Sequence, residues 1–398
     1  MNLRQLFQQH LAPTSPAPMN IEMVRAEGVY LWDAAGKKYI DLISGFSVSN
    51  IGHSHPSVVK AVQEQAARYM HLMVYGELIQ SPVVSYARLL TDHLPAELNC
   101  VYFTNSGAEA TEGAMKLAKR VTGRTKMIAF QNAYHGSTQG ALSLIGDEYW
   151  RRSFRPLLPG IYHFPYGSAE VLDAIDEMTA CVIVETVQAE SGVTAPDPAW
   201  IRQVQKKCKE KGALLILDEI QAGFGRTGTL WAFEQMGIEP DVLLLGKALG
   251  GGMPLGAFIA SRERMHQLSY EPVLGHITTF GGHPVSCAAG MAAMEVLLSS
   301  QCISRVKEKE KLLLRELQHP AIQSIQSIGC WMSLQFASPE LNQRIVHQCV
   351  KNGLLTDWFI FAPDRLRIAP PLTIEEEVLL EACGKIVLSI EQVLAQPA

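Results

Sequence analysis

Short apolar runs alternate with helical stretches between about residues 100 and 290, and this alternation constrains the fold more than any other feature. The runs are VYF, MIAF, CVIVE, ALLILD, DVLLLG and AFIA. Strands that alternate with helices predict an α/β fold with a mostly parallel sheet and crossover helices. With 398 residues, of which 47% are hydrophobic, the chain can bury a large core and form more than one domain.

The two ends of the chain differ in character from this central region. Residues 11–18 are rich in proline and predict an extended arm. Near the other end, helical patterns at 301–317 and 339–352 flank short strands, and a last helix follows Thr373, with Glu376 completing a capping box. We therefore expect an N-terminal arm and small-domain segment over 1–45, a large domain over 46–290 and a smaller α/β C-terminal domain over 291–398.

Lys247 and Asp218 each follow an apolar run that predicts a buried strand. Ligands of open α/β sheets bind beyond the carboxyl ends of the strands, so both side chains should reach one crevice. Burial disfavours a charged lysine and makes its amine available as a nucleophile, for example toward an aldehyde to form a Schiff base. The alternatives are a lysine that reaches water and an aspartate that caps the next turn.

Two further features suit pyridoxal phosphate (PLP). A buried carboxylate needs a partner, and Asp218 could keep the pyridine nitrogen of PLP protonated so that the ring acts as an electron sink. The segment CVYFTNSGAEATEGAMKLAKR runs from a strand through Ser106 and Gly107 into a helix. Free N–H groups at a helix N-terminus bind phosphate, Gly107 permits close approach, and Ser106 adds a hydroxyl donor. Asn105 could instead be an ordinary N-cap.

With these elements in this order, the chain resembles the class III (omega) aminotransferases of fold type I, and among them the acetylornithine and ornithine aminotransferase group. The resemblance rests on VYLWDAAGKKYIDL (29–42), NIGHSHP (50–56), NSGAEA (105–110), YHGST (134–138), ETVQAESG (185–192), DEIQAGFGRTG (218–228), GKALGGGMPLGA (246–257), TTFGGHP (278–284) and RIAPPLT (367–373). It implies that the large domain holds PLP on a mostly parallel, seven-stranded sheet.

The resemblance also assigns roles to single residues. Lys247 would form the Schiff base and carry the proton, and Asp218 would pair with the pyridine nitrogen. The other expected cofactor contacts are Ser106, Gly107 and Ala108 at the phosphate, Tyr134 on the ring face, Gln221 near the ring hydroxyl, His135 and Glu185, and Thr279 at the phosphate of a neighbouring subunit. Structural alternatives stay open for three of these residues. Tyr134 could be part of the core, His135 could be a buried histidine whose hydrogen bonds are satisfied, and Thr279 could be an ordinary strand residue.

Four residues would contact the substrate. Arg367 would bind a carboxylate with its planar fork, and Glu190 would pair with Arg367 when no carboxylate is present. Ser137 departs from the family, because acetylornithine, ornithine and 4-aminobutyrate enzymes usually carry arginine there, and Phe46 replaces a tyrosine of ornithine aminotransferases. Losing a charge-assisted pair removes about 1.5–3 kcal/mol. The sequence therefore leaves the amino donor open.

The expected activity is a PLP-dependent transamination from an amino acid or omega-amine donor to a 2-oxo acid such as 2-oxoglutarate. The resemblance implies a homodimer with shared active sites. Alternatives on the same scaffold are a 4-aminobutyrate, diamine or other omega-transaminase, an aminomutase or a decarboxylase. A binding protein without turnover is disfavoured by the joint presence of Lys247, Asp218 and the phosphate loop.

Composition excludes several other classes. The net charge is −5 and no block of basic residues occurs, which argues against nucleic-acid binding. No apolar run approaches a membrane span, and the N-terminus lacks the apolar core of a signal peptide. The eight cysteines are scattered and form no CxxC pair, which is typical of a reduced, cytoplasmic protein. The spacing of His and Cys gives no metal site.

Overall fold

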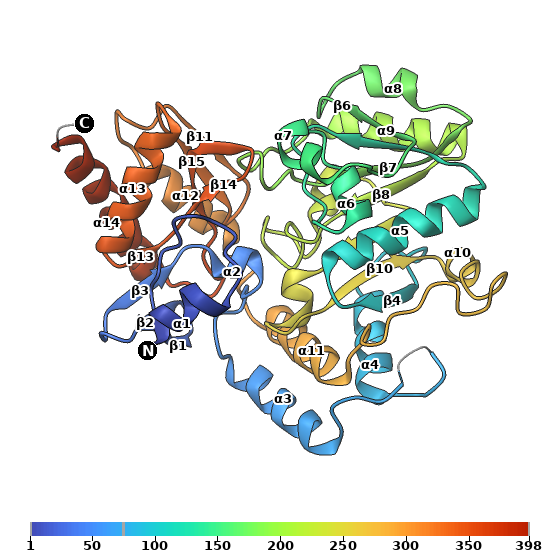
Figure 1. The fold of residues 1–398 in the computed structure, drawn as a ribbon, viewed down its shortest axis with the longest axis horizontal. Helices are drawn as coiled ribbons and strands as arrows, with labels where there is room; N and C mark the ends of the chain where they lie inside the picture. Colours follow the sequence, from blue (N-terminus) through green and yellow to red (C-terminus); the bar gives the residue numbers. More distant parts are fainter. Residues whose placement is uncertain (1, 74–75, 397–398) are drawn as a thin grey trace.

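A seven-stranded sheet forms the centre of the larger part of the molecule (Figure 1). The computed structural model describes residues 2–73 and 76–396. Within the sheet, only β10 runs against its neighbours, so the prediction of a mostly parallel sheet is confirmed. Its strands, in spatial order, are β4 (Cys100–Thr104), β10 (Gly256–Ala260), β9 (Val242–Leu245), β8 (Leu214–Asp218), β7 (Thr179–Glu185), β5 (Lys126–Phe130) and β6 (Ile161–Phe164).

Helices cover both faces of this sheet because its central strands are apolar without interruption. Side chains alternate between the faces of a strand, so a fully apolar strand needs a cover on each side. In β7, Val182 packs in the core cluster that holds Ile201 of α9 (Pro198–Lys211). Its neighbour Ile183 packs in the cluster that holds Leu117 of α5 (Gly107–Thr122).

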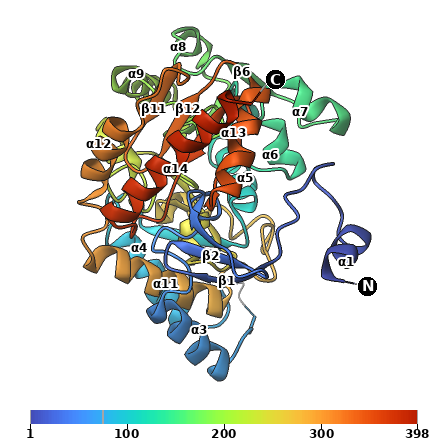
Figure 2. The same ribbon diagram turned by 90° about the vertical axis from the view of Figure 1, so that its left-hand side faces the viewer.

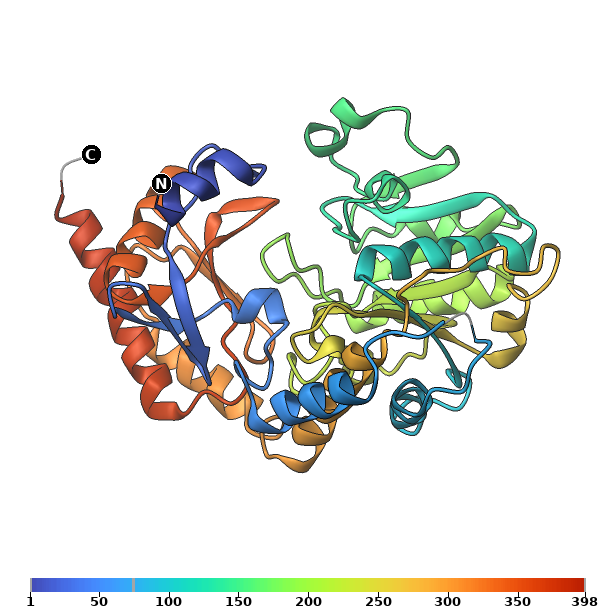
Figure 3. The same ribbon diagram turned by 60° about the horizontal axis from the view of Figure 1, so that its bottom comes forward.

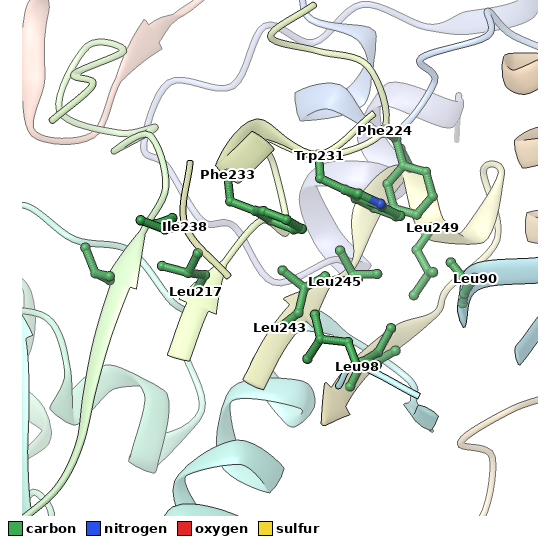
Figure 4. Packing of buried hydrophobic residues seen from close by; sticks show 14 of the residues in the cluster. Leu90, Leu98, Leu217, Phe224, Trp231, Phe233, Ile238, Leu243, Leu245 and Leu249 are labelled. Carbon is green, nitrogen blue, oxygen red and sulfur yellow. The ribbon is translucent and has the colours of Figure 1, made fainter. Parts of the chain in front are cut away.

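Trp231 and Phe224 anchor the glycine-rich segment that follows β8. Figure 4 shows Trp231 above Leu245 of β9, with the ring of Phe224 beside it on the side of Leu249. The two rings meet edge to face with their centroids 5.0 Å apart, and both side chains are buried. Because these rings fix residues 224–231, they also fix the loop just before them, which begins at the end of β8.

The second unit combines both ends of the chain. Figure 2 looks onto it, and Figure 3 shows it beside the larger unit. One sheet has the order β1 (Met23–Glu27), β2 (Tyr30–Asp33), β3 (Lys38–Asp41) and β13 (Leu354–Leu355), and the other has the order β11 (Ser324–Ser327), β12 (Met332–Gln335), β15 (Ala362–Ile368) and β14 (Trp358–Phe359). Ile40 pairs with Leu354 in parallel, and residues from both ends share one core cluster. The covering helices are α12 (Val306–Glu316), α13 (Pro339–Lys351) and α14 (Glu376–Leu394).

Two details of the chain ends differ from the sequence expectation. The prediction of a capping box at Thr373 is wrong. The N-cap of α14 is Glu375, which makes no side-chain capping bond, and the Thr373 hydroxyl has no hydrogen-bond partner in the described chain. Backbone pairing of Ile374 N–H with the Pro371 carbonyl (3.1 Å) places Thr373 in a turn before the helix. In the N-terminal arm, helix α1 (Leu3–His10) precedes the proline-rich stretch.

The expected boundary at residue 290 falls inside helix α11 (Pro284–Ser299). Buried residues of this helix on both sides of 290, from Cys287 to Leu297, pack into the core of the seven-stranded sheet. We therefore propose that the large domain extends to the end of α11 and that the small domain joins residues before about 45 to those after about 300.

Arg226 links the two units. Its fully buried guanidinium donates hydrogen bonds to Ser44 Oγ (3.1 Å) and Asn50 Oδ1 (2.5 Å). It also donates to the carbonyl oxygens of Cys330 (2.9 Å) and Pro370 (2.6 Å). These bonds give Arg226 a structural role, since they join the loop after β8 to both ends of the chain. Among the helices of residues 2–73 and 76–396, none is both long and apolar enough to span a membrane.

Candidate active site

A cavity of about 200 Å³ lies where three parallel strands end. Glu185 ends β7, Asp218 ends β8 beside it, and Lys247 follows β9 by two residues. Nine residues expected from the sequence line this cavity: Gly107, Ala108, Tyr134, His135, Ser137, Glu185, Asp218, Gln221 and Lys247. The sequence reasoning missed five others, Gly136, Val187, Ala189, Ile220 and Ala222, although all five lie inside the quoted motifs.

Lys247 is half-buried and its backbone is in the left-handed region, with φ of 50°. Its ammonium donates a hydrogen bond of 2.5 Å to Gln221 Oε1. Burial lowers the pKa of Lys247, while the charges of Glu190 and Asp218 oppose this effect. A lysine with a lowered pKa yields its neutral, nucleophilic amine more readily than a lysine in water.

Asp218 and His135 form a buried pair on the cavity wall. Asp218 Oδ2 lies 2.6 Å from His135 Nδ1, and its Oδ1 accepts the N–H of Ile220 at 2.8 Å. Burial opposes protonation of His135, but the hydrogen bond to Asp218 and its charge outweigh burial and raise the histidine pKa. The pair therefore holds the Asp218 carboxylate in a fixed direction and retains a proton beside it.

Glu185 closes another side of the cavity. Its carboxylate accepts the N–H groups of Tyr134 (3.0 Å) and Ala189 (2.9 Å). Burial raises the pKa of Glu185 to about 7, partly offset by the charge of His135. Glu185 thus fixes the chain at Tyr134, whose hydroxyl lies 2.9 Å from the Ser137 hydroxyl.

The N-terminus of α5 faces this cavity through Gly107 and Ala108. The first N–H groups of a helix have no partner within the helix. Space is tight here, since a Cβ on Gly107 would lie 2.8 Å from Ile220 Cδ1, and one on Gly136 would lie 2.5 Å from Ala108 Cβ. Ser106 is the N-cap of α5, and its hydroxyl accepts the N–H of Glu109 (3.2 Å). It does not line the cavity.

Two buried polar atoms on the cavity wall test whether PLP fits. His135 Nε2 and Gln221 Nε2 both lack a hydrogen-bond partner among the residues that the structure describes. Buried polar atoms are normally paired, so each indicates a missing polar group. Together with the helix N-terminus and the Lys247 amine, they match a phosphorylated aromatic aldehyde with polar ring substituents. The residues present therefore fit PLP.

Arg367 and Glu190 meet beside the cavity but do not line it. Arg367 Nη1 and Nη2 donate to the two oxygens of Glu190 at 3.1 and 2.9 Å. A second carboxylate, Asp357, accepts from Arg367 Nε at 2.8 Å. The sequence reasoning missed Asp357, which lies ten residues before Arg367 and meets it across the hairpin of β14 and β15.

Phe46 covers Arg367 from a strained turn. Its ring centre lies 5.1 Å from the guanidinium carbon of Arg367. Phe46 and its neighbours Ser44, Gly45 and Ser47 have φ of 62°, 47°, 60° and 64°. Left-handed backbone costs roughly 1–2 kcal/mol for each residue other than glycine. Strain of this kind is common at functional sites. Thr279, by contrast, is exposed and does not line the cavity.

Comparisons with known proteins agree with this site. The family model of the class III aminotransferases matches residues 12–390. The acetylornithine aminotransferase of Methanopyrus kandleri is 40% identical over 392 residues, which are 97% of this chain and 98% of the relative. The ornithine aminotransferase of Toxoplasma gondii, described with PLP at its active site, superposes with a TM-score of 0.90 at 29% identity, covering 98% of this chain and 94% of that one.

An (S)-enantioselective omega-transaminase from Thermomicrobium roseum superposes equally well, with a TM-score of 0.90 at 28% identity over 99% of both chains. The predicted fold class, the transaminase activity and the PLP cofactor are confirmed by these findings. The chain belongs to the class III aminotransferases.

Proposed function

We propose that this enzyme moves an amino group from a donor of the acetylornithine or ornithine type to a 2-oxo acid such as 2-oxoglutarate. The observation that carries the proposal is the Arg367 fork, which Glu190 occupies close to the Lys247 amine. A planar fork of this kind binds carboxylates in two-point contact. Because Glu190 is itself a carboxylate, it can cover the fork in one half-reaction and yield to the acceptor in the other.

The cavity residues divide the remaining work. Lys247 would hold PLP and move the proton at the donor carbon, with Gln221 placing its amine. Asp218, fixed by His135, would hold a proton on the ring nitrogen. The N-terminus of α5 would hold the phosphate, and Tyr134 would cover the ring. When bound, PLP supplies an electron sink for the carbanion that proton removal leaves.

A second candidate activity is an omega-transaminase for donors without a distal carboxylate. It is favoured by Ser137, which offers the site a hydroxyl paired with the Tyr134 hydroxyl instead of a cation. Diamines and simple omega-amines need no such cation. We expect 4-aminobutyrate to be a weak donor for the same reason.

One experiment separates these candidates. The holoenzyme is mixed with acetylornithine, ornithine, 4-aminobutyrate or a diamine, and the donor half-reaction is followed by the cofactor absorbance. 2-Oxoglutarate is then added and glutamate is measured, with Lys247→Ala as the control. Glutamate formed from acetylornithine or ornithine supports the first candidate, and glutamate formed only from the diamine supports the second. Rearranged donor without any glutamate would instead indicate an aminomutase.

We also propose a homodimer whose subunits share active sites. The segment around Thr279 exposes several large apolar side chains, Val273, Leu274, Ile277 and Phe280. Large apolar side chains exposed close together in the sequence favour an interface here. Sedimentation across a dilution series, with activity measured in parallel, tests this, and a fully active monomer would contradict it.

A cytoplasmic location stays a prediction, supported by eight cysteines that are all free.

A further inference from the structure

Arg367 binds two carboxylates on two different edges of its guanidinium. Glu190 occupies the edge formed by Nη1 and Nη2, and Asp357 occupies Nε. Arg367 Nη2 also donates to the carbonyl of Trp358 at 3.1 Å, and the ring centre of Phe359 lies 4.1 Å from the guanidinium carbon. The guanidinium is fully buried, so every one of its partners affects how it sits.

The two carboxylates differ in how the chain holds them. Asp357 immediately precedes β14, and its backbone carbonyl accepts the N–H of Arg367 at 3.0 Å. Thr356 donates its hydroxyl to the Arg367 carbonyl at 2.6 Å, so the backbone around Asp357 is tied to the arginine itself. Glu190 reaches Arg367 from a separate loop after β7. Its Oε2 accepts the N–H of Ile360 at 3.0 Å, and its backbone carbonyl accepts the N–H of Phe361 at 3.0 Å, so its contacts with the hairpin lie at the turn and not beside Arg367.

Displacement of Glu190 would take one carboxylate partner away from the buried Arg367 guanidinium, and Asp357 would remain as the other. A substrate carboxylate can reach the Nη1 and Nη2 edge only after Glu190 has left it. A buried cation without a partner is strongly unfavourable. Asp357 makes its hydrogen bond to Nε on a different edge from Glu190, so it would keep the guanidinium neutralised during the exchange, while the Trp358 carbonyl and the Phe359 ring help to hold it in place.

We propose that Asp357 is a positioning residue for the acceptor. It holds the Arg367 guanidinium in place while the substrate carboxylate replaces Glu190. This inference rests on the proposed role of Arg367 as the acceptor site. Asp357 itself does not touch the substrate. Burial raises the pKa of Asp357 to about 6, with Arg367 lowering it and Glu190 and Asp41 raising it.

The test compares Asp357→Ala and Asp357→Asn with a matched control, Asp364→Asn. Asp364 lies on the same hairpin, but its carboxylate accepts from Gln335 (2.9 Å) and not from Arg367. Binding of glutarate, an unreactive dicarboxylate, to the holoenzyme is measured by calorimetry. The two half-reactions are measured separately, the donor one with an amine that has no carboxylate.

We expect Asp357→Ala to weaken glutarate binding and to raise the KM for 2-oxoglutarate by about tenfold or more, as loss of a bond to a charged group implies. The donor half-reaction should change much less, because Glu190 still occupies Arg367 in that step. Asp357→Asn keeps an oxygen for Arg367 Nε and should lie between alanine and wild type. Asp364→Asn should bind glutarate as the wild type does.

Equal glutarate binding by the wild type and both Asp357 variants would overturn the proposal. So would an equal loss in both half-reactions, which would mean a general structural role. If Asp357→Ala does not fold, Asp357→Asn decides the question on the same two measurements. A wild-type enzyme that neither binds glutarate nor consumes 2-oxoglutarate would refute the proposed acceptor itself, a result distinct from failure of the Asp357 role alone.

Discussion

Replacing Asp218 by asparagine should lower the pKa of His135 and turn its Nδ1 from a hydrogen-bond donor into an acceptor. Asp218 accepts two hydrogen bonds, from His135 Nδ1 (2.6 Å) and from Ile220 N–H (2.8 Å). Asparagine has only one oxygen, and if that oxygen stays on Ile220, its amide N–H₂ faces the imidazole. His135 Nδ1 must then accept rather than donate. With the Asp218 charge gone, burial dominates, so the pKa of His135 should fall below its ordinary value.

The size of the effect follows from the lost bond. A hydrogen bond to a charged group contributes about 1.5–3 kcal/mol, or roughly 10- to 150-fold in an equilibrium. The donor half-reaction should slow by at least this factor, because the substitution also removes the carboxylate at the ring nitrogen. In the protein without cofactor, the wild type gains stability from the raised His135 pKa. That gain is fully present below the unfolded pKa and is lost as the pH rises through the folded pKa.

Three measurements check this reasoning. The imidazole of His135 is titrated by NMR, the donor half-reaction is followed by stopped-flow absorbance, and unfolding by denaturant is compared at two pH values. The stability difference between wild type and Asp218→Asn should be larger at about pH 6 than well above the raised pKa of His135. An unchanged His135 pKa together with a near-normal half-reaction would refute the assignment of Asp218.

Borohydride reduction of the holoenzyme followed by peptide mapping should place the pyridoxyl group on Lys247, and a label on another lysine would exclude this role. Ser137→Arg should improve carboxylated donors by about tenfold or more, whereas Ser137→Thr should not, and a wild type that already uses 4-aminobutyrate efficiently would contradict the account of specificity. Gly136→Ala should destabilise the protein by about 1–3 kcal/mol and weaken PLP binding, because the new Cβ would meet Ala108. Gly384→Ala is the control, because a Cβ there would meet no atom within 4 Å, and equal melting temperatures for the two glycine variants would contradict this prediction.

The sheet and the cavity could be predicted because both depend on local sequence patterns. Continuous apolar runs identify strands that are buried on both faces, and the first polar residue after each run identifies the sheet edge. Glu185, Asp218 and Lys247 are such residues, and all three line the cavity.

Contacts that depend on register or on distant packing could not be predicted in this way. Asp357 meets Arg367 only because of an irregularity between β14 and β15 at Trp358 and Phe359. The left-handed turn that places Phe46 contains just one glycine, so its composition does not indicate it. The proposed shift of the domain boundary rests on packing as well, because helix α11 continues the apolar pattern of the large core without a break at residue 290.

The pairing of Ile40 with Leu354 sets the order in which this chain can finish folding on the ribosome. Strand β3 is synthesised 314 residues before its partner in β13. At about 5–20 residues per second, the N-terminal strands wait roughly 15–60 s with an open edge. The central sheet can form during this interval, because all its strands lie between residues 100 and 260. Nascent chains should therefore carry a folded centre and three paired N-terminal strands in which β3 still has an open edge, and such an edge can pair with another chain until β13 covers it.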